Sequence, residues 1–88
     1  MTRIRRRADG ILEREVVGDM LLLDAETGLI HQLNETAGFI WRNCADAISV
    51  AAIAELLANT FDVEEDTALR DVTEAVRRMR ELRLVVEA

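Results

Sequence analysis

The sequence predicts an α+β domain of winged-helix-like order, in which a three-stranded antiparallel sheet at the N-terminal end is followed by three α-helices. Two patterns and the length predict it. Residues 11–33 consist of short apolar runs separated by turn residues, which is typical of strands joined by hairpins. Residues 35–83 carry apolar side chains three and four positions apart, the spacing of amphipathic helices. A chain of 88 residues suits one small domain.

The three strands are predicted at residues 11–17, 20–24 and 29–33. The first alternates apolar and charged side chains, and Gly18-Asp19 after it is a two-residue hairpin signal. The second is apolar on both faces, and Thr27-Gly28 supplies turn residues before the third. In a simple meander of this kind, the first and third strands both lie at the edges of the sheet.

The third predicted strand, residues 29–33, is an edge without the usual protection. The first strand carries Glu13, Arg14 and Glu15, and charges of this kind discourage further strands from pairing. The third strand has only a histidine as a titratable group. We therefore expect another strand to pair with it. That strand comes either from a different peptide or from a second copy of the chain in a homodimer.

The first helix is predicted over residues 35–44. Asn34 has a side chain suited to capping a helix N-terminus, and Glu35 lies where the helix dipole favours negative charge. Apolar residues then recur at the spacing of one helix face, at Ala37, Ile40, Trp41 and Cys44. We expect the single tryptophan and the single cysteine to lie in the core.

Two further helices are predicted. Ser49 caps the second, whose core face is expected to consist of Val50, Ile53, Leu56 and Leu57, with Phe61 packing beyond its end. Asp62 and Glu65 have the spacing of a capping box, which predicts that Asp62 caps the third and longest helix. A stripe along this helix carries Leu69, Val72, Val76, Met79 and Arg83, with Leu82 beside it. Residues 84–86 then add a short strand or pack against the core.

The charge distribution bears on possible partners. The net charge is −6, from eleven arginines, no lysine and seventeen acidic residues, which argues against a general nucleic-acid binder. Four arginines among residues 1–10 predict a flexible basic arm before a single domain at residues 11–88. A small winged-helix DNA-binding regulator is the alternative function. However, the second predicted helix contains Glu55 and no positive charge.

Several other classes of protein lack support in the sequence. The longest uncharged run is too short to span a membrane and no signal peptide is visible, so we expect a cytoplasmic location. One cysteine and one histidine form neither an internal disulfide nor a metal-ligand set. No nucleophile and base pair, convincing carboxylate pair or Gly-rich phosphate loop is visible. We therefore expect no enzymatic activity, no cofactor and no metal.

An ordered set of motifs resembles the PqqD family and covers residues 20–86. The set comprises T-G-x-x-x-x-L-N-x-T-A-x-x-I-W at residues 27–41, S-V-x-x-I-A-E-L-L at residues 49–57, a break at residues 61–63, A-x-x-D-V at residues 68–72 and L-x-L-V at residues 82–85. The chain departs from the family near its end. Relatives often have a lysine-glycine pair before the last apolar residues, whereas this chain has Leu82-Arg83-Leu84.

The resemblance implies a peptide chaperone, also called a RiPP recognition element. Such domains bind the leader of a ribosomally made precursor peptide and present it to a modifying enzyme, which is a radical SAM enzyme, a peptidase or a cyclase. The products include a quinone cofactor and lasso peptides. The leader adds to the third strand, in a groove flanked by the last helix. Carried over to this chain, the peptide-binding residues are Leu29, Ile30, His31, Gln32 and Leu33 on the strand, and Arg70, Thr73, Arg77 and Arg80 on the helix.

Simpler interpretations of these residues stay open. His31 on a strand is also consistent with an ordinary surface histidine. The helix arginines also have the spacing of ion pairs within the helix, between Glu74 and Arg77 or Arg78, and between Arg77 and Glu81. If the arginines do face the groove, they favour leaders that carry Asp or Glu. The sequence does not decide which shoulder of the helix faces the third strand.

Overall fold

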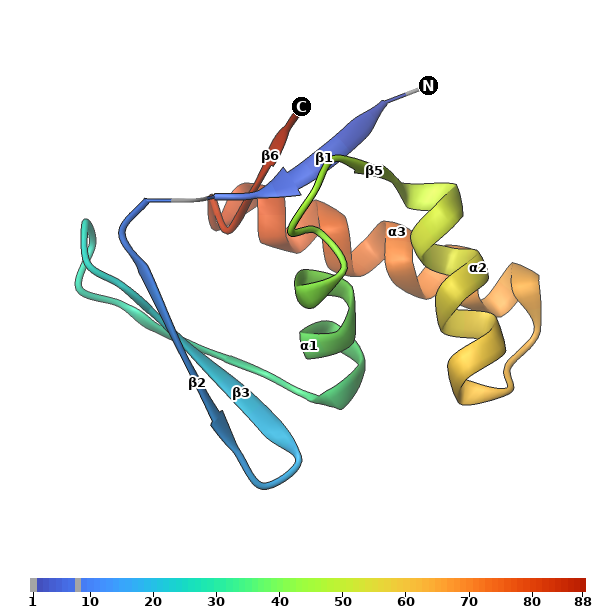
Figure 1. Cartoon of the computed structure of the whole chain (residues 1–88), viewed down its shortest axis with the longest axis horizontal. Helices are drawn as coiled ribbons and strands as arrows, with labels where there is room; N and C mark the ends of the chain where they lie inside the picture. Colours follow the sequence, from blue (N-terminus) through green and yellow to red (C-terminus); the bar gives the residue numbers. More distant parts are fainter. Residues whose placement is uncertain (1, 8) are drawn as a thin grey trace.

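The computed structural model describes residues 2–7 and 9–88, which form an α+β fold. The elements are β1 (Arg3–Arg6), β2 (Ile11–Val16), β3 (Asp19–Asp24), β4 (Ile30–Leu33), α1 (Glu35–Arg42), β5 (Ile48–Ser49), α2 (Val50–Phe61), α3 (Glu65–Glu81) and β6 (Val85–Glu87). The strands form two antiparallel sheets, of order β2-β3-β4 and β5-β1-β6. Helix α1 lies between the first sheet and α2 (Figure 1). The predicted class, with three helices after an N-terminal meander, is confirmed.

The meander β2-β3-β4 closely follows the prediction. Strand β3 is central, and its register pairs Met20 with Leu33 and Leu22 with His31. Met20 and Leu22 are buried on the face that meets the helices. The β2-β3 turn contains Gly18 at φ 79°, a backbone conformation that glycine adopts without strain. The third strand begins at Ile30, one residue later than predicted.

The second sheet is the main difference from the predicted fold. Arg3–Arg6, which the sequence predicts as part of a flexible arm, form β1 and pair with both β5 and β6. The physical reason is Ile4, whose side chain is 1% exposed and lies in the core. Because Ile4 is the one apolar residue among several arginines, the local sequence pattern does not indicate a buried strand here. Met1 and Ala8, which also belong to the predicted arm, lie outside the described residues.

Helix α1 has the predicted cap and core face. The Asn34 side chain accepts a hydrogen bond from the Ala37 backbone N–H at 2.8 Å. Trp41 and Cys44 are buried, as predicted. The Trp41 indole N–H donates to the carbonyl of Leu84 at 3.3 Å, which joins α1 to the chain after α3. Burial raises the pKa of the Cys44 thiol to about 11, so this thiol stays protonated at neutral pH.

Helix α2 has the predicted cap but a different core face. The Ser49 hydroxyl accepts a hydrogen bond from the Ala52 N–H at 3.1 Å. Ile53 and Leu57 are buried as predicted, whereas Leu56 is 41% exposed. The buried face instead continues through two alanines, Ala54 and Ala58. Small side chains let neighbouring helices approach closely, and α2 packs directly on α3.

The predicted capping box before α3 is wrong. Asp62 is the C-cap of α2, with φ 53° and its N–H donating to the Ala58 carbonyl. Aspartate tolerates this left-handed conformation better than most residues, and here it ends α2. Helix α3 therefore begins at Glu65 after Glu64, whose side chain caps no N–H among the described residues.

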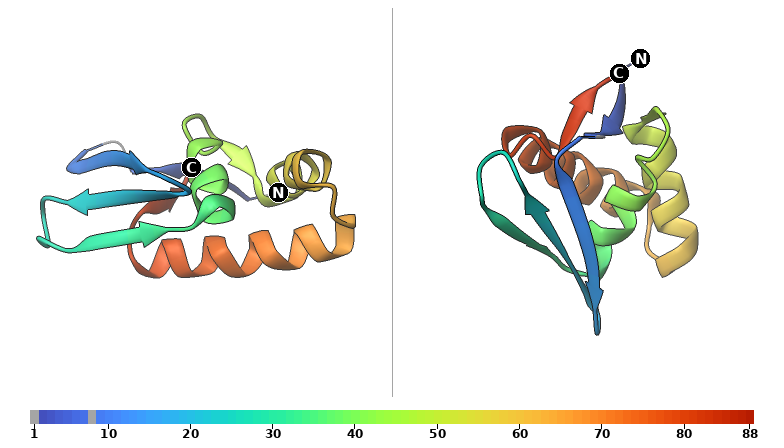
Figure 2. Two further views of the ribbon diagram at one scale, coloured as in Figure 1. Left: turned by 90° about the horizontal axis from the view of Figure 1, so that it is seen from below. Right: turned by 60° about the vertical axis from the view of Figure 1, so that its left-hand side comes forward.

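The core stripe of α3 is partly as predicted. Val72, Val76 and Met79 are buried, and Ala68 is buried beside them. Leu69 and Leu82 are exposed. Arg83 does not belong to the stripe, because the helix ends at Glu81 and Arg83 has φ 59°. The chain then turns into β6, which confirms the short strand considered for this segment. Figure 2 shows α3 running along one side of the molecule, with β4 as the nearest strand of the first sheet.

Candidate functional site

Strand β4 is an open edge of the first sheet. It pairs with β3 on one side, and no strand among residues 2–7 and 9–88 pairs with its other side. The Asp24 N–H donates to the Leu29 carbonyl at 2.9 Å, so these two residues form a hydrogen-bonded pair just before β4. Because such pairs alternate along an antiparallel ladder, the backbone groups of Ile30 and Gln32 point away from β3. These groups are available to a further strand.

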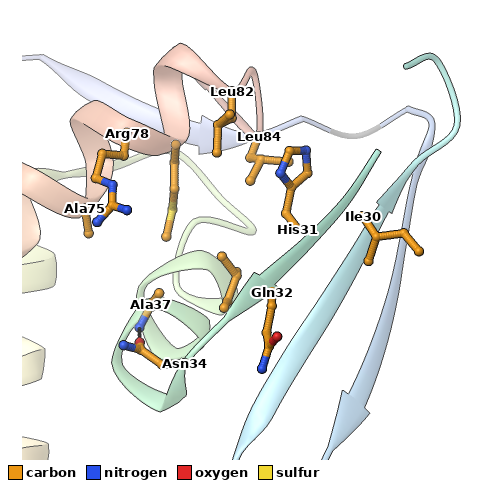
Figure 3. A pocket seen from close by; sticks show the side chains of 11 residues that line it. Ile30, His31, Gln32, Asn34, Ala37, Ala75, Arg78, Leu82 and Leu84 are labelled. Carbon is orange, nitrogen blue, oxygen red and sulfur yellow. Dashed lines mark hydrogen bonds between the residues drawn. The ribbon is translucent and has the colours of Figure 1, made fainter. Parts of the chain in front are cut away.

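A groove follows this edge. It lies between β4, the start of α1 and the C-terminal half of α3, and its volume is about 370 Å3. The lining residues are Ile30, His31, Gln32, Leu33, Asn34, Ala37, Ala75, Arg78, Met79, Leu82 and Leu84. Most of these side chains are apolar, and the groove is partly open to solvent. Figure 3 shows the side chains that line it.

Side chains of β4 alternate between the two faces of the sheet. Leu33 is buried and His31 is half-buried on the face toward the helices. Figure 3 shows His31 directed toward Leu84, whereas Ile30 lies away from them. Ile30 and Gln32 are exposed on the other face, where the Gln32 amide donates to the Asp19 carboxylate at 2.6 Å. The half-buried position of His31 in the groove differs from that of an ordinary surface histidine.

On the groove side, α3 carries Ala75, Arg78 and Met79, and its C-cap residue Leu82 follows on the same side. These residues are spaced i, i+3, i+4 and i+7, so they share one side of the helix. Met79 also belongs to the core stripe. The other three lie beside the stripe on the side toward β4, which we call the near shoulder of α3; the far shoulder is the side that carries Thr73, Arg77 and Arg80. In the sequence, this spacing next to the core stripe is the one signal that could have identified the side of α3 that lines the groove. The opposite shoulder offers an equally regular set.

The predicted peptide-binding residues divide between two places. Four of the five strand residues, Ile30 to Leu33, line the groove, and Leu29 immediately precedes β4. Three of the four helix residues lie elsewhere, because Thr73, Arg77 and Arg80 line a separate hollow of about 540 Å3 together with Val50. Arg70 is exposed and, in the described chain, lines neither space. The structure therefore brings together the strand half of the predicted set, but not the helix half.

The far shoulder of α3 carries the ion pairs that the spacing predicts. Arg77 contacts the Glu74 carboxylate at 2.6 Å and the Glu81 carboxylate at 2.6 Å. The hydrogen bond from Arg77 lowers the pKa of Glu74, and Glu74 in turn raises the pKa of Arg77. Arg80 lies 3.5 Å from the Glu87 carboxylate. Arg78 makes no ion pair with any residue that the structure describes.

The groove contains few ionisable groups. Its lining in the described chain contains one imidazole and one guanidinium, and no carboxylate. Residues 2–7 and 9–88 hold no group of three side chains that could ligate a metal. None of the helices described is both long and apolar enough to cross a lipid bilayer. An open strand edge beside an apolar groove fits an extended peptide, whose backbone pairs with the edge while alternate side chains enter the groove.

Comparisons with known proteins agree with this geometry. A solved structure described as lasso peptide synthetase B1 complexed with the leader peptide is 31% identical, with a TM-score of 0.80 over 94% of this chain and 96% of that chain. The PqqD truncation of Methylobacterium extorquens PqqCD, described as a stand-alone RiPP recognition element, is 21% identical with a TM-score of 0.75 over 96% and 88%.

A third structure, TbiB1 in complex with the TbiA(beta) leader peptide, is 18% identical with a TM-score of 0.79 over 92% and 93% of the two chains. At this identity the likeness concerns the fold. A search of curated proteins found no significant match. The family model of coenzyme PQQ synthesis protein D (PqqD) matches residues 19–85, from the start of β3 to the start of β6. The chain therefore belongs to the PqqD family.

Proposed function

We propose that this chain binds the leader of a ribosomally synthesised precursor peptide as an added strand on β4, and presents it to a modifying enzyme. The observation that carries the proposal is the open edge of β4 beside the groove formed with α3. The 31% identical relative is described as complexed with a leader peptide, which supports the same ligand class here. Residues 11–88, together with β1, act as one peptide-binding domain.

The energetics require side chains as well as backbone pairing. Ordering five peptide residues costs about 5 to 10 kcal/mol of backbone entropy. The backbone N–H and C=O groups of Ile30 and Gln32 offer hydrogen bonds that contribute about 0.5 to 1.5 kcal/mol each. Pairing alone therefore does not bind a peptide. Each apolar side chain buried in the groove adds about 1.5 to 3 kcal/mol, so two or three of them offset the entropy cost that backbone pairing leaves uncompensated.

The proposed role is non-catalytic. The groove binds and orients the leader, and the chemistry belongs to the enzyme that receives the peptide. By analogy with the family, this enzyme is a radical SAM enzyme, a peptidase or a cyclase. Because the leader occupies β4, the remaining surfaces stay free for the enzyme.

Proline at position 32 tests strand addition directly. Gln32→Pro removes the one N–H at this position, which points to the open edge, and edge strands tolerate proline where the N–H faces outward. Gln32→Ala is the matched control, because both variants lose the side-chain bond to Asp19. A short precursor reading frame is sought beside the gene, and its fluorescently labelled leader is titrated into each variant. We expect Gln32→Pro to bind about tenfold or more weakly than Gln32→Ala.

Equal affinity of the two variants would exclude pairing at this edge. Self-pairing of β4 in a homodimer is the competing use of the same edge. Analytical ultracentrifugation with and without the leader distinguishes them. A dimer that forms through β4 dissociates when the leader binds, whereas a monomer stays a monomer and gains only the mass of the peptide.

A further inference from the structure

The two ends of the groove differ in chemistry. Near the middle of β4, the helix side is apolar, with Leu82 and Leu84 facing His31 (Figure 3). Toward the end of β4, the helix side carries Ala75 and Arg78, which lie above the start of α1. Arg78 is the one side chain in the described lining with a permanent charge. A peptide that fills the groove therefore passes from an apolar end to a cationic end.

The guanidinium of Arg78 is free to pair with a ligand, because Arg77 pairs with the acidic side chains nearby. The acids placed to pair with Arg78 along the helix are Glu74 at i−4 and Glu81 at i+3. Both carboxylates instead contact Arg77 at 2.6 Å on the far shoulder of α3. Arg78 has no ion pair in the part of the chain that the structure describes. Its guanidinium is left to pair with a group from outside the domain.

We infer that Arg78 recognises a carboxylate of the bound peptide. This inference rests on the proposed function. Peptides that this chain selects carry Asp or Glu on the same face as an apolar residue that occupies the Leu82 and Leu84 end. Because successive side chains of a strand point to opposite faces, the acid lies an even number of residues from the apolar residue. An acidic side chain at an odd spacing points away from α3 and does not contact Arg78.

A selection from random peptides tests the inference without a known leader. A displayed library of twelve-residue peptides is selected separately on the unmodified chain, on Arg78→Gln and on Arg70→Gln. The last is the matched control, because Arg70 carries the same charge on the same helix, lines neither the groove nor the far hollow, and makes no ion pair with the residues that the structure describes. On the unmodified chain and on Arg70→Gln, we expect acids enriched at even spacing from an apolar residue. On Arg78→Gln, we expect this enrichment to disappear.

A charge swap measures the same contact in one complex. One acidic peptide from the selection and its Arg-substituted counterpart are titrated into the unmodified chain and into Arg78→Glu. We expect the acidic peptide to lose about three- to tenfold in affinity on Arg78→Glu, and the substituted peptide to recover most of that loss. The difference shrinks as salt rises, because ions screen a contact near the surface.

The outcomes separate the two proposals. If the unmodified chain selects no peptide, the proposed function fails and this inference fails with it. If peptides are selected with no acid preference, or with acids at odd spacing, the inference about Arg78 is overturned while strand addition stands. Equal loss of the preference in Arg70→Gln and Arg78→Gln also overturns it, because the effect then comes from the overall charge of α3.

Discussion

Arg7 donates a hydrogen bond from its guanidinium to the carboxylate of Asp24, with 2.7 Å between Nη2 and Oδ1. Asp24 is 1% exposed at the end of β3, and its carboxylate also accepts from the Glu26 N–H at 2.9 Å. Arg7 donates a second hydrogen bond to the Arg83 carbonyl at 3.2 Å, just beyond α3. One side chain thus ties the meander to the end of the helix, and these two elements form the walls of the groove.

The Arg7–Asp24 pair predicts that the stability of the fold depends on pH. The hydrogen bond from Arg7 lowers the pKa of Asp24 from 3.8 to about 2. Because the carboxyl is more acidic when folded, its stabilising contribution is present above pH 4 and is lost as pH falls toward 2. Urea unfolding of the chain and of Asp24→Asn at pH 7, 4, 3 and 2 measures it. We expect the unmodified chain to lose more stability over this interval, and identical slopes would contradict the assignment.

The groove wall predicts a difference between two leucines of similar exposure. Leu82 and Leu69 are 46% and 45% exposed at opposite ends of α3, but only Leu82 lines the groove. We expect Leu82→Asp to weaken leader binding about tenfold or more, because it places a charge at the apolar end. Leu69→Asp leaves the affinity nearly unchanged. Fluorescence anisotropy gives the affinities, and similar melting temperatures confirm that both variants fold. A comparable loss in both would exclude this groove as the peptide site.

Strand β1 predicts that truncating its buried side chain destabilises the fold, although the sequence suggests that this segment is a flexible arm. Replacing a buried isoleucine by alanine costs about 2 to 5 kcal/mol, so Ile4→Ala should reduce the free energy of unfolding by that amount. The exposed neighbour provides the control, because Arg5→Ala removes a larger side chain and should change stability little. Chemical denaturation measures both. If Ile4→Ala is as stable as Arg5→Ala, residues 3–6 do not form part of the core.

The turn after α3 predicts a stabilising substitution. Arg83 has φ 59°, a left-handed conformation that costs a residue with a Cβ about 1 to 2 kcal/mol. Arg83→Gly should raise the free energy of unfolding by about 0.5 to 1 kcal/mol, after the greater flexibility of glycine in the unfolded chain is counted. Arg83→Ala keeps the strain and should show no gain in urea unfolding. A gain of equal size in Arg83→Ala would point to the side chain instead.

Local sequence patterns determined most of the elements and the open edge of the first sheet. The short apolar runs and the turn residues of 11–33 predicted the meander, and the lack of charge in residues 29–33 marked the strand that forms its open edge. The helix caps at Asn34 and Ser49 were also evident, since a cap depends only on residues within one turn. These features depend on neighbours along the chain, which is why the sequence is enough to predict them.

The tertiary structure decided the second sheet and the face of α3 that meets β4. Strand β1 pairs with residues 48–49 and 85–87, far away in the sequence, and only Ile4 marks it locally. Arg77 and Arg78 lie on either side of one core stripe, so the helix pattern treats the two shoulders alike. The shoulder that faces the groove depends on how the end of α3 is held in place, through contacts such as Trp41 with Leu84, and Arg7 with both Asp24 and Arg83. Contacts of this kind join distant segments, and no local period encodes them.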